Sequence, residues 1–245
     1  MNAPRCRLLP FEVSAGPWNM AADEVLLDSA VAGQASLRFY GWSEATLSLG
    51  YFQAEAQRRL DPRLAGLPFV RRPSGGAALV HHHELTYALA LPAGPPWQSR
   101  ESWLLRMHAV VAAALATRGI AARPCASDEE QRHGDVLCFL HHTPGDLRIG
   151  WAKVAGSAQR KTRGALLQHG GILLAASPHA PQLTGIAELT GQRLTPAEVR
   201  TAVVEQLARQ TGFCIDSADW TADERRHIAE RCAARYAQPA WNHKR

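Results

Sequence analysis

Two arginines stand directly before a serine and a pair of glycines in Arg71–Gly76, Arg-Arg-Pro-Ser-Gly-Gly. Consecutive glycines can adopt positive φ and let a ligand approach the backbone closely, so that N–H groups point at an anion or a carbonyl. Arginine side chains suit a phosphate or a carboxylate. The stretch lacks the spacings of a P-loop and of a dinucleotide-binding loop. The residues alone leave two alternatives open: a ligand-binding loop, or a tight turn with exposed arginines before a β-hairpin.

A lysine precedes a run of small residues in Lys153–Ser157, Lys-Val-Ala-Gly-Ser. A lysine at the start of a strand is usually solvated, but the small residues after it would let a ligand lie against the backbone. Cys138 is ambiguous in a similar way, since a lone cysteine is usually a small core residue. It becomes a nucleophile only beside a cation that favours the thiolate.

Three histidines and a glutamate follow the glycine pair at His81–Glu84. In a strand His81 and His83 would share one face, which could place two ligands on a metal. A second possible group consists of Cys138, His141 and His142. No further ligand at a recognised spacing accompanies either group. We therefore expect no metal site, and instead one inward histidine hydrogen-bonded beside a ligand.

Composition excludes several classes of protein. The 245 residues are 46% hydrophobic and 20% charged, with a formal charge of +5, which is ordinary for a globular domain. No apolar run is long enough to cross a bilayer, and no concentrated basic run indicates nucleic-acid binding. The five cysteines form no CxxC pair, so neither a disulfide framework nor a cysteine-rich zinc site is indicated. We expect a cytoplasmic protein.

The elements that would position these residues follow from periodicity and capping signals. Asn19 is a plausible N-cap for a first helix that ends before Gly33. Capping boxes at Thr195–Glu198 and Thr221–Glu224 predict two helices near the C-terminus. Strands are predicted at 37–42, 46–51, 68–72, 77–80, 85–91, 147–151, around Lys153 and at 165–175, and a further helix at 103–116. This order favours a single α+β domain over residues 1–245, with C-terminal helices from about residue 195.

The two glycine-containing stretches resemble the signature segments of the lipoate-protein ligase and octanoyltransferase family, which shares its fold with biotin protein ligases. Three further segments agree in order: Asn19–Glu24, Leu37–Tyr40 and Leu47–Gln53. The resemblance covers about residues 19 to 174. It implies one α+β catalytic domain with a mixed β-sheet flanked by helices, and no accessory domain.

The resemblance also implies roles for particular residues. Cys138 and Lys153 would be catalytic, with Lys153 contacting the acyl carbonyl. The substrate-binding residues would be Arg71, Arg72, Ser74, Gly75, Gly76, Ala77, His81, Gly156, Ser157, Ala158, His169 and Gly170.

Two reactions occur in such a family. A transferase would move octanoate from acyl carrier protein, through a cysteine thioester and without a cofactor, to a lysine of a lipoyl domain. The acceptor would be a 2-oxoacid dehydrogenase or the glycine cleavage H protein. His82–Tyr87 and Cys138-Phe139 resemble the transferases.

Ala77 matches neither group, and Asp146 lies where ligases carry an acid. An ATP- and magnesium-dependent lipoate ligase therefore remains the alternative, and a non-catalytic acyl- or lipoyl-binding protein is the second.

Overall fold

The computed structural model describes residues 3–97, 100–131 and 136–245. Its larger sheet has the strand order β12-β1-β3-β7-β11-β10-β9-β8, with β2 paired to β3. The outer strands β12, β1 and β2 run parallel to their neighbours, whereas β3 and β7 to β11 pair antiparallel, which makes the sheet mixed as expected. The strands are β1 (Arg5–Leu8), β2 (Glu12–Ser14), β3 (Ser36–Trp42), β7 (Glu84–Leu91), β8 (Arg123–Pro124), β9 (Leu147–Ile149), β10 (Ala152–Thr162), β11 (Ala165–Leu173) and β12 (Cys214–Ser217).

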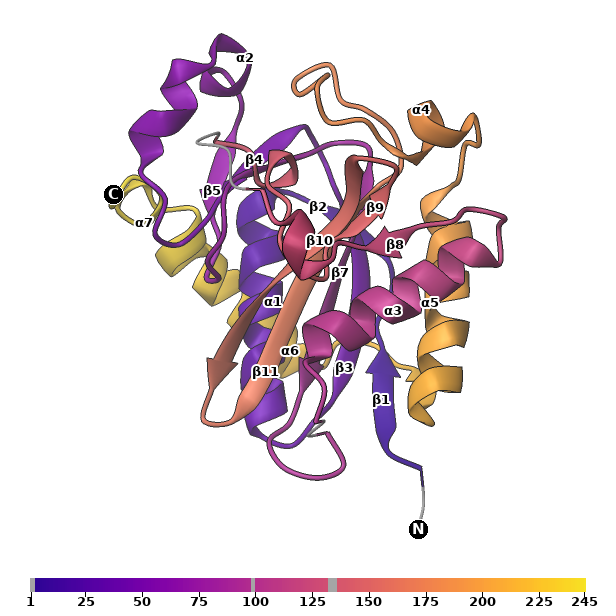
Figure 1. Ribbon diagram of the computed structural model, residues 1–245. Coiled ribbons are helices and arrows are strands. Elements are labelled where there is room, and N and C mark those ends of the chain that lie inside the picture. Colours follow the sequence, from indigo (N-terminus) through magenta and orange to yellow (C-terminus); the bar gives the residue numbers. More distant parts are fainter. Residues whose placement is uncertain (1–2, 98–99, 132–135) are drawn as a thin grey trace.

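Helices cover both faces of this sheet (Figure 1). On one face α3 (Trp103–Ala116) packs with α5 (Pro196–Thr211), and on the other α1 (Gly16–Val31) packs with α6 (Ala222–Arg231). The remaining helical segments are short: α2 (Pro62–Ala65), α4 (Ile186–Thr190), α7 (Pro239–Asn242) and the turns η1 (Glu55–Leu60), η2 (Ser127–Glu129), η3 (Cys138–Leu140) and η4 (Cys232–Tyr236). Within the described ranges, no helix is long and apolar enough to span a membrane.

Strand β7 shows how the sequence separates the two faces. Leu85, Tyr87 and Leu89 point into the core beneath α3 and α5, whereas Ala88 and Ala90 face α1. Successive side chains of a strand point to opposite faces, so one eight-residue segment contributes to both cores. The small alanine side chains leave room for α1 to pack close to the sheet.

A second, three-stranded sheet has the order β5-β4-β6 and comprises β4 (Thr46–Leu49), β5 (Phe69–Arg71) and β6 (Leu79–His81). The predicted hairpin after the glycine pair is therefore wrong. Strand β6 pairs with β4, whereas β7 pairs with β3 and β11 in the larger sheet. The segment 72–78, called the glycine stretch below, links β5 to β6 across β4. The chain then passes from the smaller sheet to the larger one between β6 and β7.

Most predicted elements are present, and one predicted cap is wrong. Helix α1 begins at Gly16, with Pro17 in its first turn, so Asn19 lies inside the helix. The Asn19 side chain is completely buried and donates to the backbone carbonyls of Ser14 and Gly41. The caps at Thr195 and Thr221 are confirmed. The short strands β1, β2 and β12 and helix α7 were missed because they are too short to show periodicity.

Glu224 connects α6 to the sheet and to α1. Its carboxylate accepts from Arg7 at 2.7 and 3.1 Å and from the Ser29 hydroxyl at 2.7 Å. It also caps its own helix by accepting from Thr221. Burial acts to raise the pKa of Glu224, but the hydrogen bonds from Arg7, Thr221 and Ser29 outweigh it and lower that pKa to about 2.

A carboxyl group with a depressed pKa stabilises the fold above its unfolded-state pKa, roughly 4.3, and this contribution is lost as the pH falls towards the folded-state pKa. We expect Glu224→Gln to lower the free energy of unfolding by about 2–3 kcal/mol at pH 7. Measured by urea unfolding, the difference in free energy of unfolding between wild type and Glu224→Gln should be smaller at pH 3 than at pH 7. Glu230→Gln, on an exposed face of the same helix, should have little effect. If Glu224→Gln lowers the free energy of unfolding equally at pH 7 and pH 3, the ionised Glu224 carboxylate is not the source of the stabilisation.

Candidate active site

Lys153 is buried at the start of β10, where a solvated lysine would be the ordinary expectation. Only 4% of the residue is exposed. Its Nζ atom lies 2.7 Å from Oδ2 of Asp146 and 3.7 Å from Sγ of Cys138. It also donates to the backbone carbonyls of Cys138 and His141, each at 3.4 Å. A buried ammonium requires a partner of opposite charge. Asp146 is that partner, and it holds the Lys153 ammonium beside the Cys138 sulfur.

Cys138 begins the short turn η3 and is partly exposed. Its backbone N–H donates to the carbonyl of Ala78 at 2.6 Å, and the N–H of Ala78 donates to Val136 at 2.9 Å. The segment that carries the sulfur is thereby paired to the end of the glycine stretch. The sequence left open whether Cys138 and Lys153 meet in space, and the structure brings them together.

Asp146 lies in a turn that is fixed from several sides. Its Oδ2 accepts from the backbone N–H and the hydroxyl of Thr143 at 2.8 and 2.7 Å. Gly145, at φ +91°, presents its carbonyl to Nδ1 of His108 at 2.6 Å. Sequence reasoning treated Asp146 only as a mark of a ligase. Its contact with Lys153 depends on the antiparallel pairing of β9 with β10, which the sequence did not predict.

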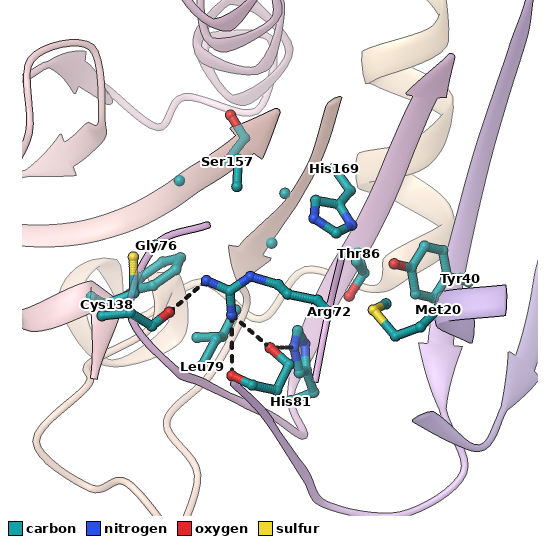
Figure 2. Close-up of a pocket in the computed structure, with 17 residues that line it drawn as sticks. Met20, Tyr40, Arg72, Gly76, Leu79, His81, Thr86, Cys138, Ser157 and His169 are labelled. Atoms are coloured by element: carbon teal, nitrogen blue, oxygen red, sulfur yellow. Dashed lines mark hydrogen bonds between the residues drawn. The ribbon is translucent and has the colours of Figure 1, made fainter. Parts of the chain in front are cut away.

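Cys138 lines a cavity whose empty space, with its open mouth included, is about 530 Å³. Figure 2 shows Cys138 and Gly76 on one side of the cavity and Met20 and Tyr40 on the opposite side. Apolar side chains and glycine backbone make up much of the wall, so the cavity suits an apolar ligand.

Ten of the predicted residues line this cavity: Arg72, Gly76, Ala77, His81, Cys138, Gly156, Ser157, Ala158, His169 and Gly170. Lys153 does not line the cavity but contacts Cys138, which does. The predicted residues Arg71, Ser74 and Gly75 do not line it. Sequence reasoning missed seven residues that do: Met20, Tyr40, Ser48, Leu79, Thr86, Phe139 and Gly171. Met20 and Tyr40 lie in segments that carried the family resemblance, which was the only signal for them.

Two glycines leave space for atoms that a side chain would displace. A Cβ atom at Gly156 would lie 2.5 Å from Cε and 3.0 Å from Nζ of Lys153. A Cβ atom at Gly170 would lie 2.6 Å from the Gly156 carbonyl oxygen and 2.8 Å from Cβ of Ser157. Gly156 therefore gives the lysine its path across β10, and Gly170 allows β10 and β11 to meet at the cavity.

Arg72 shapes the glycine stretch from within. Its guanidinium donates to the carbonyls of Gly75 and Ala77 at 2.8 and 2.7 Å and to the carbonyl and hydroxyl oxygens of Ser48, each at 3.1 Å. Burial lowers the pKa of Arg72, and the nearby Cys138 opposes that shift. The alternative of a turn with exposed arginines is therefore wrong, because both arginines are buried.

Arg71, one of the predicted substrate-binding residues, does not line the cavity. Its guanidinium donates to the backbone carbonyls of Gly50, Gln53 and Asn242. All three acceptors are backbone groups, so its bonds connect segments of the fold.

Ser74 supports the cavity from behind through a buried chain of hydrogen bonds. Its hydroxyl lies 2.5 Å from Nε2 of His169, and Nδ1 of His169 lies 2.9 Å from Oδ2 of Asp23. A carboxylate can only accept, so in the neutral imidazole Nδ1 carries the proton and Nε2 accepts from Ser74. This arrangement fixes the face that His169 presents to the cavity.

His81 is the inward histidine of its run. Its Nδ1 is hydrogen-bonded to Glu84 and its Nε2 lies 2.8 Å from the Ser48 hydroxyl. The ring stacks on Trp42 with 3.8 Å between centroids. In the described part of the chain, no group of three or more His, Cys, Asp or Glu residues is arranged to hold a metal ion.

Comparisons with known proteins agree with this geometry. Residues 16–219 match the sequence profile of the lipoyl protein ligase A/B catalytic domain. The octanoyltransferase LipM of Symbiobacterium thermophilum is 32% identical over 96% of this chain and 97% of its own. The LipM of Kyrpidia tusciae is 30% identical over 98% of each chain.

Solved structures share the fold at lower identity. A putative lipoate protein ligase from T. acidophilum superposes with a TM-score of 0.80 at 22% identity, covering 98% of this chain and 100% of that one. A lipoate-protein ligase A bound with ATP gives 0.78 at 21% identity, with 98% of each chain covered. The expected family and fold are confirmed: the chain belongs to the lipoyl protein ligase A/B catalytic domain family and is an enzyme of that family.

Proposed function

We propose that this enzyme is a cysteine-dependent octanoyltransferase of protein lipoylation. It would take an octanoyl group from acyl carrier protein and transfer it to a lysine of a lipoyl domain. The observation that carries the proposal is the 3.7 Å separation of the Cys138 sulfur and the Lys153 ammonium at the end of an apolar cavity. The names of the LipM relatives point to the same acyl group.

In the first half-reaction the Cys138 thiolate attacks the carbonyl carbon of the donor thioester. The bond from that carbon to the carrier sulfur breaks, and the carrier leaves as a thiol after taking a proton. One thioester replaces another, so the step is nearly isoenergetic. The Lys153 ammonium favours negative charge on the sulfur and on the oxygen of the tetrahedral intermediate.

In the second half-reaction the neutral amine of the acceptor lysine attacks the octanoyl-cysteine. The carbon–sulfur bond to Cys138 breaks, the sulfur returns as a thiolate, and the nitrogen loses a proton as the amide forms. Because an amide is more stable than a thioester, this half-reaction drives the transfer. No step of this sequence consumes ATP, so we propose that the enzyme needs no nucleotide.

We expect purified protein incubated with octanoyl-acyl carrier protein to gain one octanoyl group, and Cys138→Ser to gain none. Intact-protein mass spectrometry measures the adduct, and peptide mapping locates it. The other cysteines provide the control: Cys214→Ser should acylate as the wild type does, because Cys214 lies on β12 and does not line the cavity.

The same assay separates the alternatives. Failure of the wild type to form the adduct would contradict the transferase proposal. Pyrophosphate release that depends on lipoate and ATP would identify a ligase. Ligand binding that survives Cys138→Ser, with no product from any donor, would identify a binding protein.

Gly156→Ala should slow octanoylation of Cys138 by about tenfold or more and lower the melting temperature. The new methyl group would lie 2.5 Å from Lys153 Cε, so the lysine must move within the buried pair that it forms with Asp146. A displaced ammonium no longer stabilises charge at the reacting atoms, and about 1.4 kcal/mol of lost stabilisation is a tenfold lower rate. Single-turnover acylation rates and thermal melting test both parts of the expectation.

Gly66→Ala is the matched control, because nothing lies within 4 Å of the methyl group it would add. It should acylate at the wild-type rate. A normal acylation rate in Gly156→Ala would show that the path of Lys153 over Gly156 is unimportant for the reaction.

A further inference from the structure

Arg71 belongs to the signature stretch but has no contact with the cavity, which raises the question of what it does. It is completely buried. Its Nη1 donates to the carbonyls of Gly50 and Gln53 at 2.9 and 2.6 Å, and its Nη2 and Nε donate to the carbonyl of Asn242 at 2.9 and 3.2 Å. A single side chain thus joins the segment after β4 to α7.

Asn242 holds Arg71 from the other side. Its side-chain Oδ1 accepts from the backbone N–H of Arg71 at 2.8 Å. Its Nδ2 donates to the carbonyl of Tyr236 at 2.9 Å, which orients the amide. The neighbouring Trp241 donates from Nε1 to the carbonyl of Arg71 at 2.8 Å. Both the main chain and the side chain of Arg71 are therefore bound to α7.

The contact continues from Arg71 to the glycine stretch. A Cβ atom at Gly50 would lie 1.7 Å from the Gly76 carbonyl oxygen, so these two backbones touch. Tyr51 donates from its backbone N–H to the Ser74 carbonyl at 2.8 Å. Because Gly76 lines the cavity, the position of the segment after β4 determines the position of that wall.

We propose that Asn242 is a positioning residue for the acyl cavity. It holds Arg71, Arg71 holds the carbonyls of Gly50 and Gln53, and this segment supports the glycine stretch from outside. The inference rests on the octanoyltransferase function proposed above. Under it, α7 supports acyl binding although none of its residues lines the cavity. Lys153 lies on β10, and the Cys138 segment is paired to Ala78, next to the strand β6 that β4 holds in place. The loss of Asn242 therefore affects acyl binding more than chemistry.

The test is a double-mutant cycle of Asn242→Ala and Arg71→Lys. Lysine keeps the charge but lacks the planar fork that reaches three carbonyls. Each single variant should raise the half-saturating concentration of octanoyl-acyl carrier protein by about tenfold. Arg71→Lys loses hydrogen bonds from a charged group, and Asn242→Ala leaves the buried N–H of Arg71 without its acceptor. The maximal acylation rate should change less than about twofold. The double variant should be no worse than the more affected single variant, because the two residues act through one another.

Gln238→Ala is the matched control. Gln238 is exposed, and its side chain donates to the Ala233 carbonyl at 2.6 Å within the same C-terminal segment. It should leave the half-saturating concentration unchanged. A half-saturating concentration for Asn242→Ala within twofold of wild type, or additive effects in the cycle, would overturn the proposal. If Asn242→Ala does not fold, Asn242→Ser takes its place in the cycle.

Alkylation of Cys138 separates this inference from the proposed function. The rate ratio of N-octylmaleimide to N-ethylmaleimide at Cys138, followed by peptide mass spectrometry, reports whether the cavity accepts an eight-carbon chain. It requires no acyl transfer. We expect Asn242→Ala to lower this ratio and Gln238→Ala to preserve it. A wild type that forms no octanoyl adduct would refute the transferase, whereas an unchanged ratio in Asn242→Ala would refute the role of Asn242.

Discussion

The buried ammonium of Lys153 is the constraint on which the site depends. A charge with 4% exposure is tolerated only where its surroundings compensate for the lost hydration. Asp146 supplies the opposite charge at 2.7 Å, and two backbone carbonyls accept from the same ammonium. The sulfur of Cys138 shares this environment. The sulfur of Cys138, the ammonium of Lys153 and the carboxylate of Asp146 thus form one unit whose members come from three consecutive segments.

The neighbouring structure serves to hold that unit against an apolar cavity. Thr143 and His108 fix the turn that carries Asp146, and Gly156 leaves the space through which the lysine passes. On the opposite wall, Arg72 folds the glycine stretch around its own guanidinium. Arg71 and Arg72 are adjacent in sequence but stabilise different parts of the structure. Arg72 shapes the cavity from inside, while Arg71 binds the outer segments together.

Much of the fold could be predicted from local patterns. The apolar run of β7 and the apolar face of α3 appear directly in the sequence, and Thr195 and Thr221 have the capping chemistry of helix starts. Asn19 shows where local reasoning fails. It has the residue type of an N-cap, but its side chain bonds to the Ser14 and Gly41 carbonyls instead. The competing partners are distant in the chain, and only tertiary packing brings them near.

The sequence by itself determined the α+β class through the order of its elements. Its resemblance to a known family identified the mixed sheet and most of the residues that line the cavity, and its glycines and small residues marked backbone that must approach something closely. Tertiary structure alone decided which polar groups meet. The contacts of Lys153 with Asp146 and Cys138 depend on the register of β9 with β10 and on where η3 packs. The role of Arg71 depends on Asn242, which lies 171 residues away. Charge pairing in a folded chain is set by distance in space, and a residue's type does not reveal which partner the fold brings within reach.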